Sequence, residues 1–136
     1  MAIEEKLVEY EIDGEVYEAF MAWDGEEAGP RPGVLVAHAW AGRTEFEDEK
    51  ARWLARRGYV GFALDVYGKG VRGGSTEENS ALMSPLVEDR PLLQGRLAVA
   101  LATLREQTEV DGSRCAAMGF CFGGLCVLDM ARTGTD

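Results

Sequence analysis

The chain has 136 residues, enough for one domain with a single hydrophobic core. It carries 24 acidic and 14 basic residues, so its formal charge of −10 disfavours nucleic acids and anionic membrane surfaces as partners. Hydrophobic residues make up 46% and charged residues 28% of the sequence, which is typical of a globular protein and excludes a disordered chain. No apolar run approaches the roughly 20 residues of a membrane span, and no secretory signal is visible at the N-terminus, so we expect a cytoplasmic protein.

The three cysteines are Cys115, Cys121 and Cys126, an odd and tightly clustered set that favours reduced thiols over a disulfide framework. His38 is the single histidine, so the paired ligand spacing of a zinc site is absent. We therefore expect neither a metal nor another cofactor.

The first half of the chain predicts a hairpin followed by a strand and a helix. Residues 7–23 alternate polar and apolar side chains around Asp13-Gly14, a pair that suits a tight hairpin turn. The unalternated apolar run 34–39 predicts a central parallel strand, buried on both faces. A capping-box pattern at Thr44 and Glu47 then begins a helix.

This helix is expected to end at Gly58 and to bury Phe46, Trp53 and Leu54 on one face. A second apolar run, residues 59–64, predicts the next strand. The glycine-rich segment that follows, together with residues 74–79, is expected to form a loop.

The second half predicts further strand and helix units. A helix is expected over residues 89–107, because leucines and alanines recur there at spacings of three and four. A turn at 111–113 should lead into a strand over 115–120, and a helix over 122–133 should end at Gly134. This order of elements indicates an α/β fold with a largely parallel sheet, in which active sites lie at the carboxyl ends of the strands.

A Gly-x-Cys-x-Gly pattern lies where the last predicted strand meets the last predicted helix. It is formed by Gly119, Cys121 and Gly123. A nucleophile at the tip of a sharp strand-to-helix turn needs small residues two positions before and after it, so that strand and helix can approach closely. The pattern therefore predicts a nucleophile elbow with Cys121 as the catalytic residue. Cys115 and Cys126 are expected to pack in the core.

The predicted elbow also favours the thiolate of Cys121, because the helix dipole and unpaired backbone N–H groups point toward it. The backbone N–H of Phe122 would point toward the oxyanion that forms on attack, which supplies half of an oxyanion hole. The alternative is that Cys121 is a small buried residue at a helix start.

Three segments together resemble the dienelactone hydrolase family of α/β-hydrolases. They are Gly-Phe-Cys-Phe-Gly-Gly at 119–124, Val-Leu-Val-Ala-His-Ala-Trp-Ala-Gly at 34–42 and Arg-Gly-Tyr-Val-Gly-Phe-Ala-Leu-Asp-Val-Tyr-Gly at 57–68. The resemblance implies the N-terminal portion of an α/β-hydrolase fold. It also implies hydrolysis of a small carboxylic ester or lactone through a thioester acyl-enzyme, with a Cys-Asp-His triad. Cys121 matches the family's nucleophile, and Trp40 matches the residue whose backbone N–H completes the oxyanion hole with Phe122.

The sequence departs from the family pattern at a residue that would contact the nucleophile and at the arginine that would bind a substrate carboxylate. Ala39 replaces a glutamate that contacts the resting thiol in well-known members. The family's substrate-carboxylate arginine has two candidate matches, Arg72 and Arg90, and each would otherwise be a solvated surface charge.

A second departure concerns the triad, whose acid and histidine follow the nucleophile along the chain in α/β-hydrolases. No histidine follows Cys121. His38 precedes it and is expected to be structural, while Asp129, on a helix surface, and Asp136 are expected to be solvated. We therefore expect residues 1–136 to form a single, truncated α/β-hydrolase domain.

Two other interpretations compete with a hydrolase. Residues 68–73 spell Gly-x-Gly-x-x-Gly, but a dinucleotide-binding fingerprint opens a helix directly from a strand, whereas loop is expected here. The other interpretation is a catalytically incomplete fragment, or a non-catalytic binding or assembly module derived from such a hydrolase. In either case the strand that ends at Phe120 should have an open edge, where a dimer partner or a complementary chain would pair.

Overall fold

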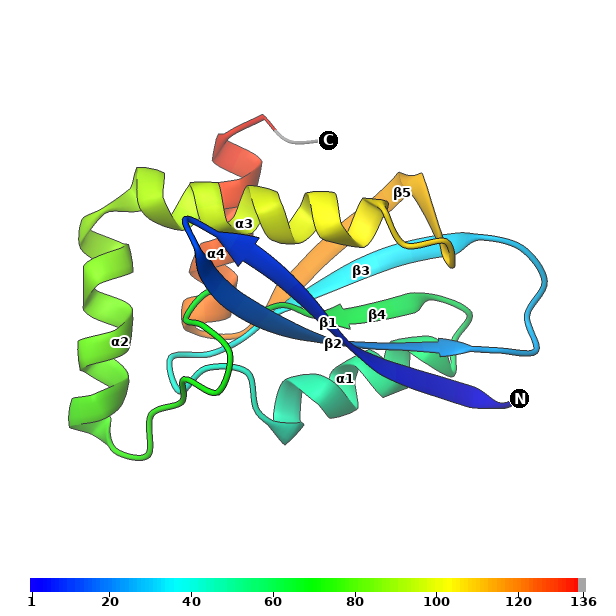
Figure 1. Ribbon diagram of the computed structural model, residues 1–136, viewed down its shortest axis with the longest axis horizontal. Helices are drawn as coiled ribbons and strands as arrows, with labels where there is room; N and C mark the ends of the chain where they lie inside the picture. The colour runs from blue at the N-terminus through cyan, green and yellow to red at the C-terminus, as the bar shows by residue number, and fades with distance from the viewer. Residues whose placement is uncertain (135–136) are drawn as a thin grey trace.

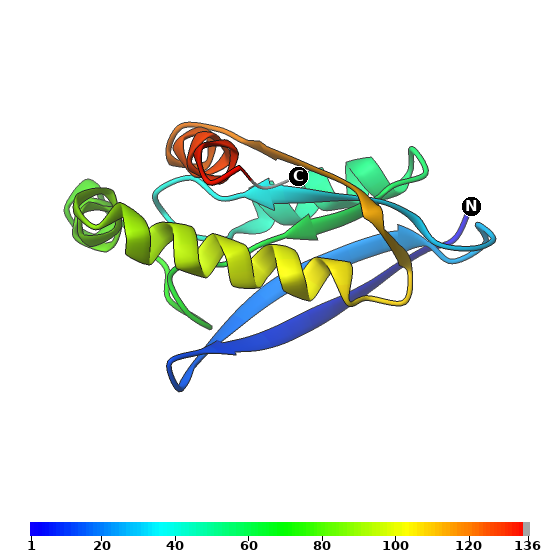
Figure 2. The same ribbon diagram turned by 90° about the horizontal axis from the view of Figure 1, so that it is seen from above.

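The computed structural model describes residues 1–134, which form one five-stranded sheet with helices on both faces (Figure 1). In chain order the elements are β1 (Ile3–Ile12), β2 (Glu15–Asp24), β3 (Arg31–Ala37), α1 (Glu45–Ala55), β4 (Val60–Ala63), α2 (Thr76–Glu88), α3 (Arg90–Arg105), β5 (Val110–Gly119) and α4 (Phe122–Arg132). The strand order across the sheet is β1-β2-β4-β3-β5, with α1 on one face and α3 and α4 on the other (Figures 1 and 2). No helix among residues 1–134 is both long and apolar enough to cross a membrane.

The sheet joins an antiparallel hairpin to a parallel core. β1 pairs with β2 and β2 with β4 in antiparallel register, whereas β3 lies parallel to both β4 and β5. The predicted hairpin is confirmed, with Asp13 and Gly14 at φ values of 52° and 83°. The central position predicted for the strand after residue 33 is also confirmed. Since β3, β4 and β5 run the same way, their carboxyl ends meet at one edge of the sheet.

Helix α1 has the predicted capping box, in which the Thr44 backbone N–H donates to the Glu47 carboxylate at 2.8 Å. The prediction that Phe46 and Trp53 lie on its buried face is wrong, because they are 51% and 42% exposed. Helix and sheet approach too closely for large side chains: a Cβ added to Gly61 on β4 would lie 2.3 Å from the Ala51 carbonyl oxygen. The buried face is therefore built mainly from Ala51, Leu54 and Ala55.

Helix α2 corrects the prediction of a loop over residues 74–79. The helix begins at Thr76, and the Ser75 hydroxyl caps it by accepting a hydrogen bond from the Glu78 N–H at 3.1 Å. The helix crosses beyond the carboxyl ends of the parallel strands, at the left of Figure 1. Within α2 only Leu86 is fully buried, so the helix lacks the broad apolar stripe that reveals a helix in a sequence.

The segment before Cys115 belongs to a strand rather than to a separate turn. β5 already begins at Val110, and its pairing with β3 shifts between Pro32, opposite Asp111, and Gly33, opposite Cys115. The predicted turn residues are thus a bulge within β5. The Asp111 carboxylate stabilises this bulge by accepting from the Ser113 N–H at 3.0 Å.

The predicted helices over 89–107 and 122–133 are confirmed as α3 and α4. Asp129 on α4 is fully buried, which contradicts the expected solvated position. Its Oδ1 accepts from Arg90 at 2.8 Å and from Arg132 at 2.6 Å. This carboxylate therefore links α4 to the start of α3.

Within residues 1–134, β5 pairs with β3 alone and lies at the edge of the sheet. Its outer row of N–H and C=O groups is thus available to another strand. We expect the 136-residue chain to associate through this edge, and sedimentation at tens of micromolar should show a dimer or larger species. A monodisperse monomer would contradict this expectation.

Candidate active site

Cys121 occupies the turn between β5 and α4 in a backbone conformation that few side chains adopt. Its φ and ψ are 56° and −118°, and among residues 1–134 Asp13 is the only other non-glycine residue with a positive φ. The thiol is exposed. Such a conformation is costly and persists only where the surrounding structure imposes it.

Close backbone packing imposes this turn. A Cβ added to Gly119 would lie 2.3 Å from the Gly123 carbonyl carbon, and one added to Gly123 would lie 2.2 Å from the Ala37 carbonyl oxygen. Real Cβ atoms are not found at such distances from backbone atoms. Both glycines of the pattern are therefore required for β3, β5 and α4 to meet as they do.

The Phe122 N–H lies at the first position of α4, directly after the thiol. The next N–H, that of Gly123, donates to the Phe120 carbonyl at 2.9 Å, and the Leu125 N–H donates to the Cys121 carbonyl at 3.2 Å. Within the described residues the Phe122 N–H has no such acceptor. A free N–H at a helix start is suited to bind a negatively charged oxygen.

Trp40 lies in a tight turn that follows β3. The Gly42 N–H closes this turn on the Ala39 carbonyl at 3.1 Å, and the Tyr67 hydroxyl donates to the Trp40 carbonyl at 2.9 Å. Within residues 1–134 the backbone N–H of Trp40, like that of Phe122, donates to no protein acceptor. The turn thus offers a second free N–H at the same end of the sheet.

A hollow of about 390 Å³ connects these groups. It is lined by Ala39, Trp40, Met83, Cys121 and Phe122. None of these side chains carries a formal charge, and the lining brings together the three residues that the sequence predicted for the nucleophile and the oxyanion hole. Met83 was missed by sequence reasoning because it lies on α2, whose start was expected to be loop.

His38 is fully buried beside this site, and both of its ring nitrogens are occupied. Nδ1 lies 2.7 Å from the Ala39 carbonyl oxygen, and Nε2 accepts from the Val66 N–H at 3.2 Å. Because Nε2 is an acceptor, Nδ1 carries the proton. Burial lowers the pKa of this imidazole below its usual value, so the ring is neutral at pH 7. The expected structural role of His38 fits this environment.

Comparison with known proteins assigns the chain to a family. Residues 18–136 match the family model described as the dienelactone hydrolase family. The chain belongs to the dienelactone hydrolase family.

Individual relatives agree with this assignment. The carboxymethylenebutenolidase of a Pseudomonas species is 31% identical over 112 residues, which cover 78% of this chain and 47% of that enzyme. The solved structure named m3DLH is 35% identical and superposes with a TM-score of 0.95 over 99% of this chain and 56% of its own. A dienelactone hydrolase-like promiscuous phosphotriesterase from metagenomic libraries is 36% identical, with a TM-score of 0.93 over 98% of this chain and 56% of its own. The α/β-hydrolase fold is confirmed, and the chain spans about half the length of these relatives.

The arginines considered for a substrate carboxylate lie outside the hollow. Arg90 is bound to the buried Asp129, and the Arg72 guanidinium donates to the carbonyl of its neighbour Val71 at 2.9 Å. Neither lines the space beside Cys121. Asp136, the other carboxylate considered, lies outside the described residues.

In this dienelactone hydrolase fold, backbone N–H groups of the glycine-rich segment 68–73 are hydrogen-bonded within the chain. The Lys69 N–H donates to the Val16 carbonyl at 2.9 Å, the Val71 N–H to Gly68 at 3.0 Å and the Gly73 N–H to Ala41 at 2.9 Å. These N–H groups are therefore already bonded and do not form a free cradle for phosphate.

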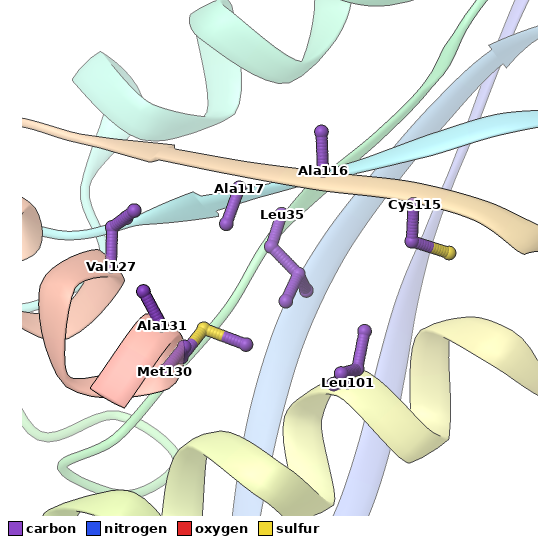
Figure 3. A pocket seen from close by; sticks show the side chains of 8 residues that line it. All are labelled: Leu35, Leu101, Cys115, Ala116, Ala117, Val127, Met130 and Ala131. Atoms are coloured by element: carbon purple, nitrogen blue, oxygen red, sulfur yellow. The ribbon is translucent and has the colours of Figure 1, made fainter. Parts of the chain in front are cut away.

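The other two cysteines lie away from the hollow. Cys126 is fully buried, as expected, and its burial raises the pKa of the thiol to about 12. Cys115 is half-buried, and its thiol faces the Asp111 and Gly112 carbonyls at 3.9 and 3.8 Å. Cys115 also lines a separate apolar cavity of about 170 Å³ between β5, α3 and α4, where Leu35, Leu101 and Met130 meet (Figure 3).

Limiting iodoacetamide is expected to alkylate Cys121 first and Cys126 last. The Cys121 thiol is exposed, whereas Cys126 is buried and stays protonated between pH 6 and 9 because its pKa is raised to about 12. Peptide mapping after partial labelling measures the order. Equal labelling of the three thiols, or preference for Cys126, would contradict the position assigned to Cys121.

Proposed function

We propose that this chain carries the nucleophile and oxyanion hole of a hydrolase for small carboxylic esters or lactones. Membership of the dienelactone hydrolase family supports this class of reaction, and the solved neighbours include an acetyl xylan esterase from a Paenibacillus species, at 26% identity and a TM-score of 0.72. The observation that carries the proposal is the exposed Cys121 at positive φ, which lines one hollow with Trp40 and Phe122, two residues whose backbone N–H groups have no acceptor within residues 1–134.

In the proposed reaction the Cys121 thiolate attacks the carbonyl carbon of the ester. The carbonyl electrons move to its oxygen, and the resulting oxyanion is stabilised by the N–H groups of Trp40 and Phe122. Collapse of this intermediate breaks the bond to the alcohol oxygen, which leaves with a proton from solvent, and the acyl group remains on sulfur as a thioester. Water then hydrolyses the thioester and regenerates the thiol.

The hollow beside the thiol indicates which acyl groups fit. Trp40, Met83 and Phe122 offer apolar surface, and no arginine or lysine among residues 1–134 lines the space. A carboxylate placed there would lose its hydration without gaining a cationic partner. The lining therefore suits a small uncharged acyl group, such as acetyl, better than one that carries a carboxylate.

The second candidate is a non-catalytic binding or assembly module, and one observation favours it. The single histidine of these 136 residues has both ring nitrogens occupied, so it is not placed to act as a general base. The two candidates differ in whether Cys121 forms a covalent acyl-enzyme.

Mass spectrometry after mixing with p-nitrophenyl acetate tests the proposal. We expect the intact chain to gain the mass of one acetyl group, and peptide mapping to place it on Cys121. Cys121→Ala should abolish the modification. Cys115→Ala, which removes a half-buried thiol outside the hollow, should retain it; acetylation that persists in Cys121→Ala would leave the binding module as the better description.

A further inference from the structure

The peptide unit that joins Ala39 to Trp40 carries one of the two proposed oxyanion donors. Its carbonyl oxygen accepts two hydrogen bonds, from the His38 imidazole at 2.7 Å and from the Gly42 N–H at 3.1 Å. No cis peptide bond occurs in the described chain, so the Trp40 N–H points away from this carbonyl. The bonds to the Ala39 oxygen therefore set the direction of the Trp40 N–H.

Tyr67 fixes the next peptide unit and also contacts the other donor segment. Its hydroxyl donates to the Trp40 carbonyl at 2.9 Å, and its ring stacks on the Phe122 ring with centroids 6.0 Å apart and an interplanar angle of 15°. The His38 ring lies against the same tyrosine, with centroids 4.7 Å apart. One side chain thus contacts both segments that supply the oxyanion donors.

We propose that His38 and Tyr67 are positioning residues that hold the Trp40 and Phe122 N–H groups in the arrangement an oxyanion requires. This inference rests on the proposed function. It gives the single histidine a role in the acylation step that differs from that of a general base.

The positioning pair is itself held rigidly. The buried Asp65 carboxylate accepts from the Tyr67 N–H at 2.9 Å and from the Gly68 N–H at 3.0 Å through Oδ1, and from the Glu18 N–H at 3.0 Å through Oδ2. The backbone N–H of Val66, which lies between Asp65 and Tyr67 in the chain, donates to Nε2 of His38. Burial raises the pKa of the Tyr67 hydroxyl, so it remains a donor at neutral pH. The loop after β4 therefore holds both side chains against the Trp40 turn, because Tyr67 belongs to this loop and His38, which follows β3, is bonded to it through Val66.

Two reactions of the same thiol separate positioning from general damage. Acylation by p-nitrophenyl acetate passes through an oxyanion, whereas alkylation by iodoacetamide displaces iodide at a saturated carbon and does not. Tyr67→Phe keeps the ring contact with Phe122 and removes only the bond to Trp40. Its matched control is Tyr59→Phe, since Tyr59 is exposed at the opposite end of β4.

Tyr67→Phe is expected to lower the rate constant of the acylation burst about 10-fold or more, since loss of a complete oxyanion donor costs about 10²- to 10³-fold. Alkylation of Cys121 should change by less than about twofold. His38→Asn, which keeps an amide donor near Nδ1, should retain more acylation than His38→Ala. Tyr59→Phe should leave both rates unchanged.

Three outcomes would overturn the inference. Unchanged acylation in both Tyr67→Phe and His38→Ala would show that neither side chain positions the donors. Equal loss of acylation and alkylation would indicate a merely structural role. No acylation of the unmodified chain would overturn the proposed function and this inference with it, whereas normal acylation of that chain together with either of the first two outcomes overturns the inference alone.

Discussion

Mixed with excess p-nitrophenyl acetate, residues 1–136 are expected to release about one equivalent of p-nitrophenol and then to stall as a thioester on Cys121. Acylation needs the Cys121 sulfur and the two proposed N–H donors, and these residues are within the chain. Deacylation needs a base to deprotonate water, a contribution of about 10²- to 10⁴-fold in rate. His38 cannot supply it without breaking its bonds to Ala39 and Val66.

A longer chain tests the explanation for this stall. With an acid and a histidine following the nucleophile in the order usual for α/β-hydrolases, the protein should turn over continuously. Stopped-flow absorbance gives the burst amplitude and the steady-state rate. Sustained turnover by the 136-residue chain, abolished by Cys121→Ala and by His38→Ala alike, would show instead that His38 acts as the base.

Gly123→Ala is expected to destabilise the fold by at least about 3 kcal/mol, the upper end of the usual cost of overpacking. The added methyl would lie 2.2 Å from the Ala37 carbonyl oxygen, and a backbone atom of the central strand cannot move aside as a flexible side chain can. Since domains have only about 5–15 kcal/mol of stability, this loss removes a large fraction of the free energy of unfolding. Urea denaturation followed by circular dichroism measures the loss.

The neighbouring Gly124→Ala is the matched control. A Cβ there would lie 3.6 Å from the Gly119 carbonyl oxygen, an ordinary contact, and alanine favours the helix. This variant should be as stable as the parent or slightly more so. If the two variants lost stability equally, the loss would come from the glycines' place in α4 and not from close packing at the elbow.

Local signals in the sequence were sufficient for most of the elements. The hairpin follows from Asp13-Gly14, where positive φ is required, and α1 follows from the capping box at Thr44 and Glu47. The elbow follows from small residues at two positions whose spacing has a steric cause. In each case the residues that decide the structure are neighbours in the chain.

Features that depend on distant segments were not predictable in this way. Phe46 and Trp53 satisfy a helical period but are about half exposed, because the face of α1 that packs on Gly61 of β4 carries the small Ala51 instead. The burial of Asp129 depends on Arg90, which precedes it by 39 positions. Met83 reaches the hollow only because α2 crosses beyond the ends of the parallel strands. The start of α2 was not predicted, because it follows a glycine-rich segment that indicates a loop.

The burial and hydrogen bonding of His38 also make the free energy of unfolding depend on pH. Protonation would turn Nε2 into a donor that faces the Val66 N–H, and would bury a positive charge whose desolvation outweighs its attraction to the carboxylates of Asp65 and Glu47. Because burial depresses the folded-state pKa below the usual value of about 6.5, the unfolded chain takes up a proton before the folded one does. The stability supplied by the neutral ring is present above pH 6.5 and declines as the pH falls below it. An acidic medium would therefore lower the stability of the fold through a side chain that is bonded directly to the Trp40 turn.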